Sequence, residues 1–99
     1  MLEPTLVTIA YTVRSEKLSE YRTLMQSLAQ RINAQPGVEF SLYQVDGAQA
    51  SYVEVYSCSS ADAYDAIEDN LDDASRDAVA KIASEFVTTR QSVTSMQRI

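Results

Sequence analysis

Glu54 and Tyr56, in the segment YVEVYSC, are two side chains that could act together on a bound molecule. They are two positions apart in an alternating segment, so a β-strand would place both on one face. A tyrosine hydroxyl can hydrogen-bond a phenol or quinone oxygen, and a partly desolvated glutamate has a raised pKa and can accept a proton. In the structural alternative, Tyr56 packs with its hydroxyl on a backbone partner and Glu54 pairs with an arginine.

Three other aromatic side chains are candidates for the lining of a pocket around this pair. They are Tyr11, Tyr64 and Phe86. Tyrosine offers a large apolar surface with one polar group, which suits a pocket for an aromatic ligand. The same property suits a core or a dimer interface, so packing is the alternative for these residues.

Several common chemistries are excluded by composition. The chain has no histidine and only two glycines. Serine-histidine catalysis and a glycine-rich phosphate loop are therefore absent. Cys58 has no histidine to activate it, so we expect a buried structural thiol. The acidic run lacks the turn glycine that a calcium loop needs, and we predict no metal site.

The length and charge of the chain limit its partners. Its 99 residues predict a single domain spanning residues 1–99. Of the net charge of −6, all of the excess lies in residues 62–77, which hold seven acidic residues and one arginine. This charge disfavours nucleic acid and an anionic membrane surface as partners. One cysteine and no long apolar segment predict a cytoplasmic protein.

Hydrophobic periodicity predicts the elements that would position these side chains. Alternation indicates four strands, at residues 6–13, 38–45, 52–58 and 90–98. A helix capped by Ser15 has an apolar stripe at three- and four-residue steps, comprising Leu18, Tyr21, Met25, Leu28 and Ile32. A second helix begins near Ser59 or Ser60 and is broken near Asp72, after which a third helical segment buries Ala78, Val79, Ile82, Ala83 and Phe86.

The resulting order predicts an α+β protein of the ferredoxin-like class, β-α-β-β-α-β, with the second helix broken in two. Its four-stranded antiparallel sheet would carry helices on one face only. A bare second face would expose either Val53 and Val55 or Tyr52 and Tyr56 to water. We therefore predict a C2 homodimer in which two sheets pack together as a shared barrel.

The run from Val38 to Ile67 resembles the dimeric α/β-barrel proteins, in particular the antibiotic biosynthesis monooxygenase-like group. The similarity covers about residues 5–98. It is carried by Gly37 before the second strand, by the step from Glu54 to Tyr56, and by the segment DAYDA at residues 62–66. It implies a dimer, a pocket between helices and sheet, and oxygenation of aromatic or quinol-like substrates without metal or flavin.

The sequence departs from this group at three positions. Tyr56 stands where catalytic members often carry tryptophan, Ile67 where many carry histidine, and Ile9 where haem-degrading members carry asparagine. Haem ligation by histidine and a histidine general base are excluded, because the chain has no histidine. The resemblance thus implies a pocket lined by Ile9 and Ile67 together with the tyrosines.

Two functions remain in view. The first is a cofactor-independent monooxygenase in which Tyr56 orients a substrate oxygen, Glu54 handles a proton, and molecular oxygen reacts with the substrate's own carbanion. The second is a non-catalytic protein on the same scaffold, which binds a small aromatic ligand or serves as an interaction dimer. A dimer with a filled pocket is a third possibility, since one fold supports many functions.

Overall fold

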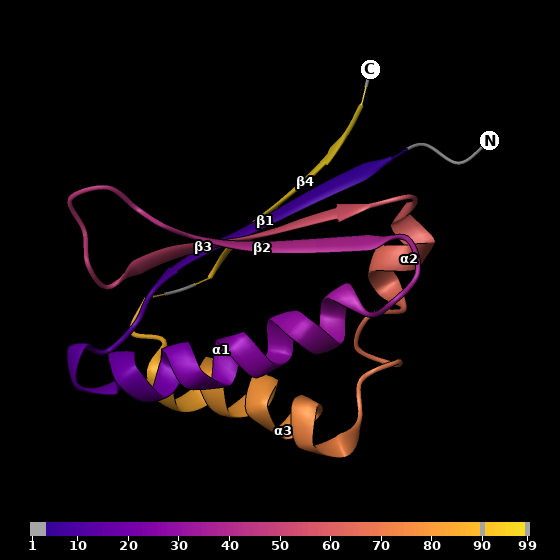
Figure 1. Ribbon diagram of the computed structural model, residues 1–99. Coiled ribbons are helices and arrows are strands. Elements are labelled where there is room, and N and C mark those ends of the chain that lie inside the picture. The colour runs from indigo at the N-terminus through magenta and orange to yellow at the C-terminus, as the bar shows by residue number, and fades with distance from the viewer. Residues whose placement is uncertain (1–3, 90, 99) are drawn as a thin grey trace.

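The computed structural model describes residues 4–89 and 91–98 and has the expected ferredoxin-like order. Figure 1 shows a sheet with the long helices side by side beneath one face. The helical elements are η1 (Ser15–Lys17), α1 (Leu18–Asn33), α2 (Ala61–Asp65), α3 (Asp73–Lys81) and the π-helical segment η2 (Ile82–Phe86). The strands are β1 (Thr5–Thr12), β2 (Val38–Gln44), β3 (Ser51–Cys58) and β4 (Ser92–Gln97).

The sheet has the order β2-β3-β1-β4, and every neighbouring pair is antiparallel. The predicted fold class is therefore confirmed. In the register of the sheet, Glu54 on β3 lies opposite Ile9 on β1 and Leu42 on β2. Because side chains alternate along a strand, Tyr52, Glu54 and Tyr56 share the face that the helices cover.

Helix α1 buries the stripe that its sequence spacing predicts. Tyr21, Met25, Leu28 and Ile32 are all buried on it. At its end, the Asn33 side chain bonds both the N–H and the carbonyl of Phe40, which ties the helix to β2. The link between them passes through Gly37, whose φ of +74° is in the left-handed region. There an added Cβ would lie 2.5 Å from Ser59 Oγ, so the chain needs glycine.

The second helix is broken, as predicted, but its first part ends well before the predicted break near Asp72. The Ser60 side chain caps α2 by accepting from the N–H of Ala63, yet this helix ends at Asp65. Ile67 and Leu71 are buried from the turns that follow rather than from a helix. Asp72 then caps α3 by accepting from the N–H of Ser75.

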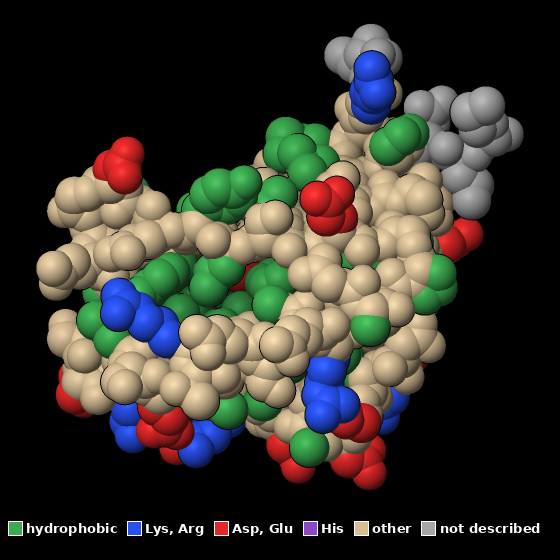
Figure 2. All heavy atoms as spheres, viewed as in Figure 1, with side chains coloured by type: hydrophobic (Ala, Val, Ile, Leu, Met, Phe, Trp, Pro, Cys, Tyr) green, Lys and Arg blue, Asp and Glu red, His purple; other side chains and the backbone are tan. Residues whose placement is uncertain are grey.

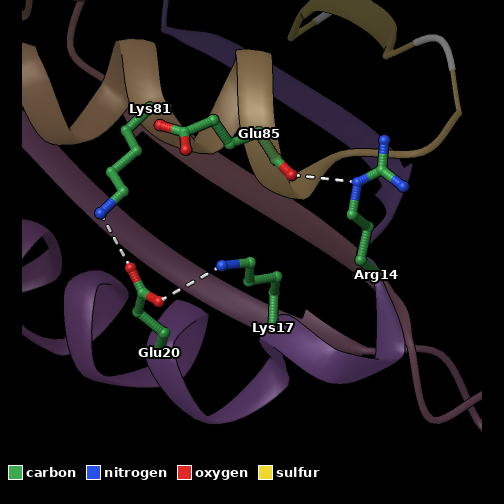
Figure 3. A network of polar contacts seen from close by, with 5 residues as sticks. All are labelled: Arg14, Lys17, Glu20, Lys81 and Glu85. Atoms are coloured by element: carbon green, nitrogen blue, oxygen red, sulfur yellow. Dashed lines mark hydrogen bonds and ion pairs between the residues drawn. The ribbon is translucent and has the colours of Figure 1, made fainter.

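A polar network joins α1 and α3 near the start of α1 (Figure 3). Glu20 on α1 pairs with Lys81 on α3 at 2.9 Å and with Lys17 on η1 at 3.9 Å. The ammonium groups of Lys17 and Lys81 also lie 5.8 and 5.9 Å from the ring of Phe86. The ammonium groups of Lys17 and Lys81 on one side, and the burial of the Phe86 ring on the other, hold η2 against the start of α1.

The described helices leave the other face of the sheet uncovered. Its large side chains include Leu6, Tyr43 and Met96, which are among the most exposed hydrophobic residues of the described chain. All six residues of β4 are exposed as well. The predicted dimer barrel would cover this face and stays a prediction. None of the helices in the described ranges is long and apolar enough to cross a membrane.

Candidate functional site

A cavity of about 360 Å³ lies between the helices and the sheet. Figure 2 shows the side of the molecule on which apolar side chains are visible in a hollow between the sheet and α1. Every layer of the fold contributes to the cavity wall. The wall is formed by Ile9, Met25, Leu28, Ile32, Glu54, Tyr56, Tyr64, Asp65, Ile67, Glu68, Leu71, Val79, Ile82, Ala83 and Gln91. Its character is apolar and phenolic, with a few carboxyl groups.

Glu54 is the buried carboxyl group of this cavity. Strand β3 runs in the interior of the sheet, so Glu54 is flanked by Ile9 on one side and Leu42 on the other. Only 8% of Glu54 is exposed. Desolvation raises the pKa of Glu54, while hydrogen bonds from Tyr11 and Tyr56 act in the opposite direction. Burial dominates, which makes this carboxylate a stronger base than a glutamate in water.

Three tyrosines form a hydrogen-bonded chain with Glu54. The Tyr56 hydroxyl donates to Oε1 at 2.6 Å, and the Tyr11 hydroxyl donates to Oε2. The Tyr21 and Tyr11 hydroxyl oxygens are 2.6 Å apart. A phenol has one proton, and that of Tyr11 goes to Glu54, so Tyr21 donates to Tyr11. The structural alternative of an arginine partner for Glu54 is wrong, because both described partners are phenols.

The phenols themselves stay protonated. Desolvation, followed by the charge of Glu54, raises the pKa of both Tyr11 and Tyr56 far above the usual value for a tyrosine. Desolvation also raises the pKa of Tyr21. These groups therefore act as hydrogen-bond donors near neutral pH. Glu54 is the member of the chain whose protonation can change during a reaction.

An aromatic wall stands beside the carboxylate. The rings of Tyr56 and Tyr64 meet edge to face, with centroids 5.4 Å apart and planes at 77°. Behind Tyr56, the ring of Phe40 lies 4.9 Å away. This packing holds Tyr56 in place and leaves Tyr56 and Tyr64 as the aromatic side chains in the cavity wall.

The structure brings together five of the seven residues predicted for the site. Glu54, Tyr56, Tyr64, Ile9 and Ile67 all contribute to the cavity wall. Tyr11 does not: it lies two residues beyond Ile9 on β1, about 7 Å farther along the strand, and only its hydroxyl reaches Glu54.

Phe86 also lies outside the cavity, so its predicted place in the wall is a second correction. Its ring has no exposed surface and packs at the end of the helical layer beneath Lys17 and Lys81. Ile82, one turn earlier, lines the cavity instead. The helical stripe was predicted as one buried surface, but the cavity occupies only part of its length.

Tyr21 is the site residue that the sequence interpretation assigned only to the core. It is fully buried, and its hydroxyl completes the chain to Glu54. A signal was present: a buried tyrosine needs a hydrogen-bond partner, and a helix interior offers none. Asp65 and Glu68 in the wall were not predicted either, because in the sequence they were only members of the acidic run at residues 62–77.

Cys58 and the acidic residues do not form a second site. Cys58 is buried, and desolvation raises the pKa of its thiol. A thiol in this state is a poor nucleophile. Within residues 4–89 and 91–98, no three potential ligands gather closely enough to hold a metal ion.

Several solved structures superpose on nearly the whole chain. A candidate antibiotic biosynthesis monooxygenase from Nitrosomonas europaea superposes with a TM-score of 0.87 at 9% identity, over 100% of this chain and 93% of that one. A second such protein, from Caulobacter crescentus, gives 0.84 at 17% identity over 99% and 92%. Rv0793 from Mycobacterium tuberculosis gives 0.82 at 20% identity over 97% and 95%.

No family model and no curated protein matches the sequence. The class defined by the fold is ferredoxin-like α+β. Within this class, the chain has the fold of the antibiotic biosynthesis monooxygenase-like proteins, and the resemblance expected from its sequence is confirmed at that level. Identities below 25% establish the fold and leave substrate and activity to the residues of the cavity.

Proposed function

We propose that this protein is a cofactor-independent monooxygenase that acts on a small aromatic or quinol-like molecule in the cavity between helices and sheet. The observation that carries the proposal is the position of Glu54, a buried carboxylate with a raised pKa in an otherwise apolar and phenolic wall. Desolvated carboxylates of this kind are typical of general bases. The description of structural neighbours as monooxygenases supports the same reaction class.

The cavity suits a ligand of one or two rings. Its volume, about 360 Å³, is at the lower end of the range for ligand pockets, about 300–1,000 Å³. The Tyr56 and Tyr64 rings offer aromatic surface to such a ligand. Glu54 accepts two hydrogen bonds, and a carboxylate has roughly four acceptor positions, so it can still accept a bond from the ligand.

In the proposed reaction the protein removes a proton and the substrate supplies the electrons. Glu54 takes a proton from an activated ring CH₂ or phenol, which leaves an electron-rich carbanion. The Tyr56 hydroxyl donates to Oε1 at 2.6 Å and so holds the carboxylate, while its oxygen can accept a hydrogen bond from a substrate hydroxyl. Molecular oxygen adds to the carbanion: one oxygen atom becomes a carbonyl, the O–O bond breaks, and the other atom leaves as water. The substrate loses two hydrogens and gains one oxygen, so no external reductant is needed.

Oxygen uptake tests this reaction. The purified protein is mixed with a panel of one-ring and two-ring phenols and hydroquinones in an oxygen electrode, with heat-denatured protein as the blank. A base of this kind contributes about 100-fold or more, so Glu54→Gln should lower the rate by at least that factor. Glu16→Gln, which changes an exposed glutamate on η1 away from the open face of the sheet, is the matched control and should leave the rate unchanged. Equal rates in wild-type protein and Glu54→Gln would remove Glu54 from the reaction.

A non-catalytic binding protein is the second candidate, and one observation favours it. Both oxygens of Glu54 already accept hydrogen bonds from tyrosines, which also satisfies a carboxylate that only helps to hold a ligand. This candidate predicts that ring compounds bind, by calorimetry, with no oxygen uptake above the blank for any member of the panel.

The homodimer is part of the proposal. The open face of the sheet includes Val55 on β3, whereas Val93 on β4 pairs with Ile9 and so lies on the helical side. A second sheet packed on the open face would bury its apolar side chains. Light scattering should give the mass of a dimer for the wild-type protein and for Val93→Lys, and that of a monomer for Val55→Lys. A wild-type monomer would overturn the shared barrel.

A further inference from the structure

The ionisable carboxyl groups in the cavity wall can carry only negative charge. The wall contains three carboxyl groups, those of Glu54, Asp65 and Glu68, and its described residues include no lysine or arginine. Glu54 is buried, whereas Asp65, at the end of α2, and Glu68, in the turn that follows, are exposed. The negative charge therefore runs from the interior of the cavity to its mouth.

Nearby arginines do not neutralise the mouth. Arg31 pairs with Asp72 at 2.6 Å. The guanidinium of Arg76 donates to the backbone carbonyls of Glu68, at 3.0 Å, and Asp69, at 2.7 Å. Among the described residues, no cation lies within ion-pair distance of the Asp65 or Glu68 carboxylates. Their charge is available to a ligand.

The aromatic wall of Tyr56 and Tyr64 lies between the Glu54 carboxyl group and the carboxylates at the mouth of the cavity. Tyr64 precedes Asp65 in the chain, and its ring meets that of Tyr56. Desolvation raises the pKa of the Tyr64 hydroxyl, and Glu54, Asp65 and Glu68 raise it further. A tyrosine ring with carboxylates around it attracts cations both through its π face and through the local field.

We propose that the cavity selects an aromatic ligand that carries a cationic amino group and rejects one that carries a carboxylate. The ring lies against Tyr56 and Tyr64 with its hydroxyl toward Glu54, and the ammonium lies at the mouth beside Asp65 and Glu68. A ligand carboxylate would meet like charge in a partly dry site, where repulsion is stronger than in water. This inference rests on the proposed binding of a ring in the cavity and adds the charge of its substituent.

Three phenols with the same two-carbon arm and a different charge test it. The arm ends in an ammonium group in tyramine and in a carboxylate in 3-(4-hydroxyphenyl)propionate, whereas 4-ethylphenol carries the arm without a charged group. Calorimetry should give the tightest binding for tyramine and the weakest for the propionate, with about tenfold or more between them. The difference should shrink as salt is added, because the mouth is exposed.

The double variant Asp65→Asn/Glu68→Gln should bring tyramine close to 4-ethylphenol. The matched control, Asp62→Asn/Asp69→Asn, removes the same charge from the same segment at residues outside the wall and should keep most of the tyramine preference. The charge selectivity would be overturned if the propionate bound as tightly as tyramine, or if both double variants lost tyramine binding to the same extent. Binding of 4-ethylphenol would still support the ring site in either case. If none of the probes binds, the ring site fails, and this inference fails with it.

Discussion

Tyr56 donates its hydroxyl proton to Glu54 Oε1 at 2.6 Å, from a position two residues farther along the same strand. Residues at this spacing share a face of a sheet, so the contact is local in sequence. Tyr11 on β1 reaches the second oxygen of the same carboxylate. One local and one long-range donor thus hold a buried acid in a fixed orientation, which a proton acceptor needs.

Removal of the Tyr11 donor should destabilise the protein. In Tyr11→Phe, Glu54 Oε2 and the Tyr21 hydroxyl both lose a partner in the interior. An unsatisfied buried polar group costs about 1–3 kcal/mol, so we expect a loss of that size in urea unfolding at neutral pH. Tyr64→Phe removes the hydroxyl of a half-buried tyrosine that is hydrogen-bonded to no described residue, and it should change the free energy of unfolding little. Equal effects of the two substitutions would contradict a role for the buried chain.

The raised pKa of Glu54 gives a pH dependence of definite sign. An isolated glutamate titrates at about 4.5, and the folded protein holds its proton to higher pH. The folded state therefore binds more protons than the unfolded state above that value, and the contribution of Glu54 to stability falls as pH rises through the folded pKa.

Comparison with Glu54→Gln isolates this contribution. The stability of wild-type protein minus that of the variant should fall with increasing pH, starting from about pH 4.5, by at most about 1.4 kcal/mol per pH unit. Urea unfolding of both proteins between pH 4 and pH 8 measures the difference. A difference that grows with pH would mean that the folded protein lowers the pKa of Glu54.

Gly37 and Gly47 allow the cost of a steric clash to be separated from the cost of backbone strain. Both have positive φ, +74° and +77°, but a Cβ would meet Ser59 Oγ at 2.5 Å only at Gly37. Gly37→Ala should therefore cost strain plus a clash, and more than about 1 kcal/mol in total. Gly47→Ala should cost the strain alone. Thermal unfolding that ranks Gly47→Ala as the more destabilised protein would contradict the close approach of β2 and the α2 cap.

Ala83 offers a way to block the cavity without changing its polar groups. Ala83, in η2, is exposed and lines the cavity. Ala80, near the end of α3, is also exposed but does not line the cavity. Ala83→Trp should reduce binding of 4-ethylphenol at least about tenfold, because the indole takes up ligand space. Ala80→Trp should bind as the wild-type protein does. Calorimetry on both variants, with circular dichroism as a check on folding, makes the comparison.

If Ala83→Trp bound 4-ethylphenol as tightly as Ala80→Trp does, the ligand would not bind in the cavity beside Ala83. An equal loss in both variants would instead point to an effect of tryptophan on the helix. Comparison of the two variants therefore distinguishes a blocked cavity from a general effect of tryptophan on the folding of α3 and η2.

Much of the fold follows from patterns short enough to be visible in the sequence. Alternation in β3 placed Glu54 and Tyr56 on one face, and the apolar stripe of α1 predicted its buried residues, Tyr21 among them. Capping by Ser60 and Asp72 follows from their positions ahead of the two helices. These features depend on neighbours within a few residues, so local physics decides them.

Local patterns in the chain are sufficient to predict the element order, the shared face of Glu54 and Tyr56, and the absence of histidine chemistry. They leave open which face of β3 meets the helices, because both Val53 and Tyr52 would suit a core. The packing of the folded chain shows that Glu54 points inward, that Tyr11 bonds it and is bonded by Tyr21, and that Phe86 lies outside the cavity. Burial and long-range hydrogen bonds depend on residues far apart in the chain, which no local pattern specifies.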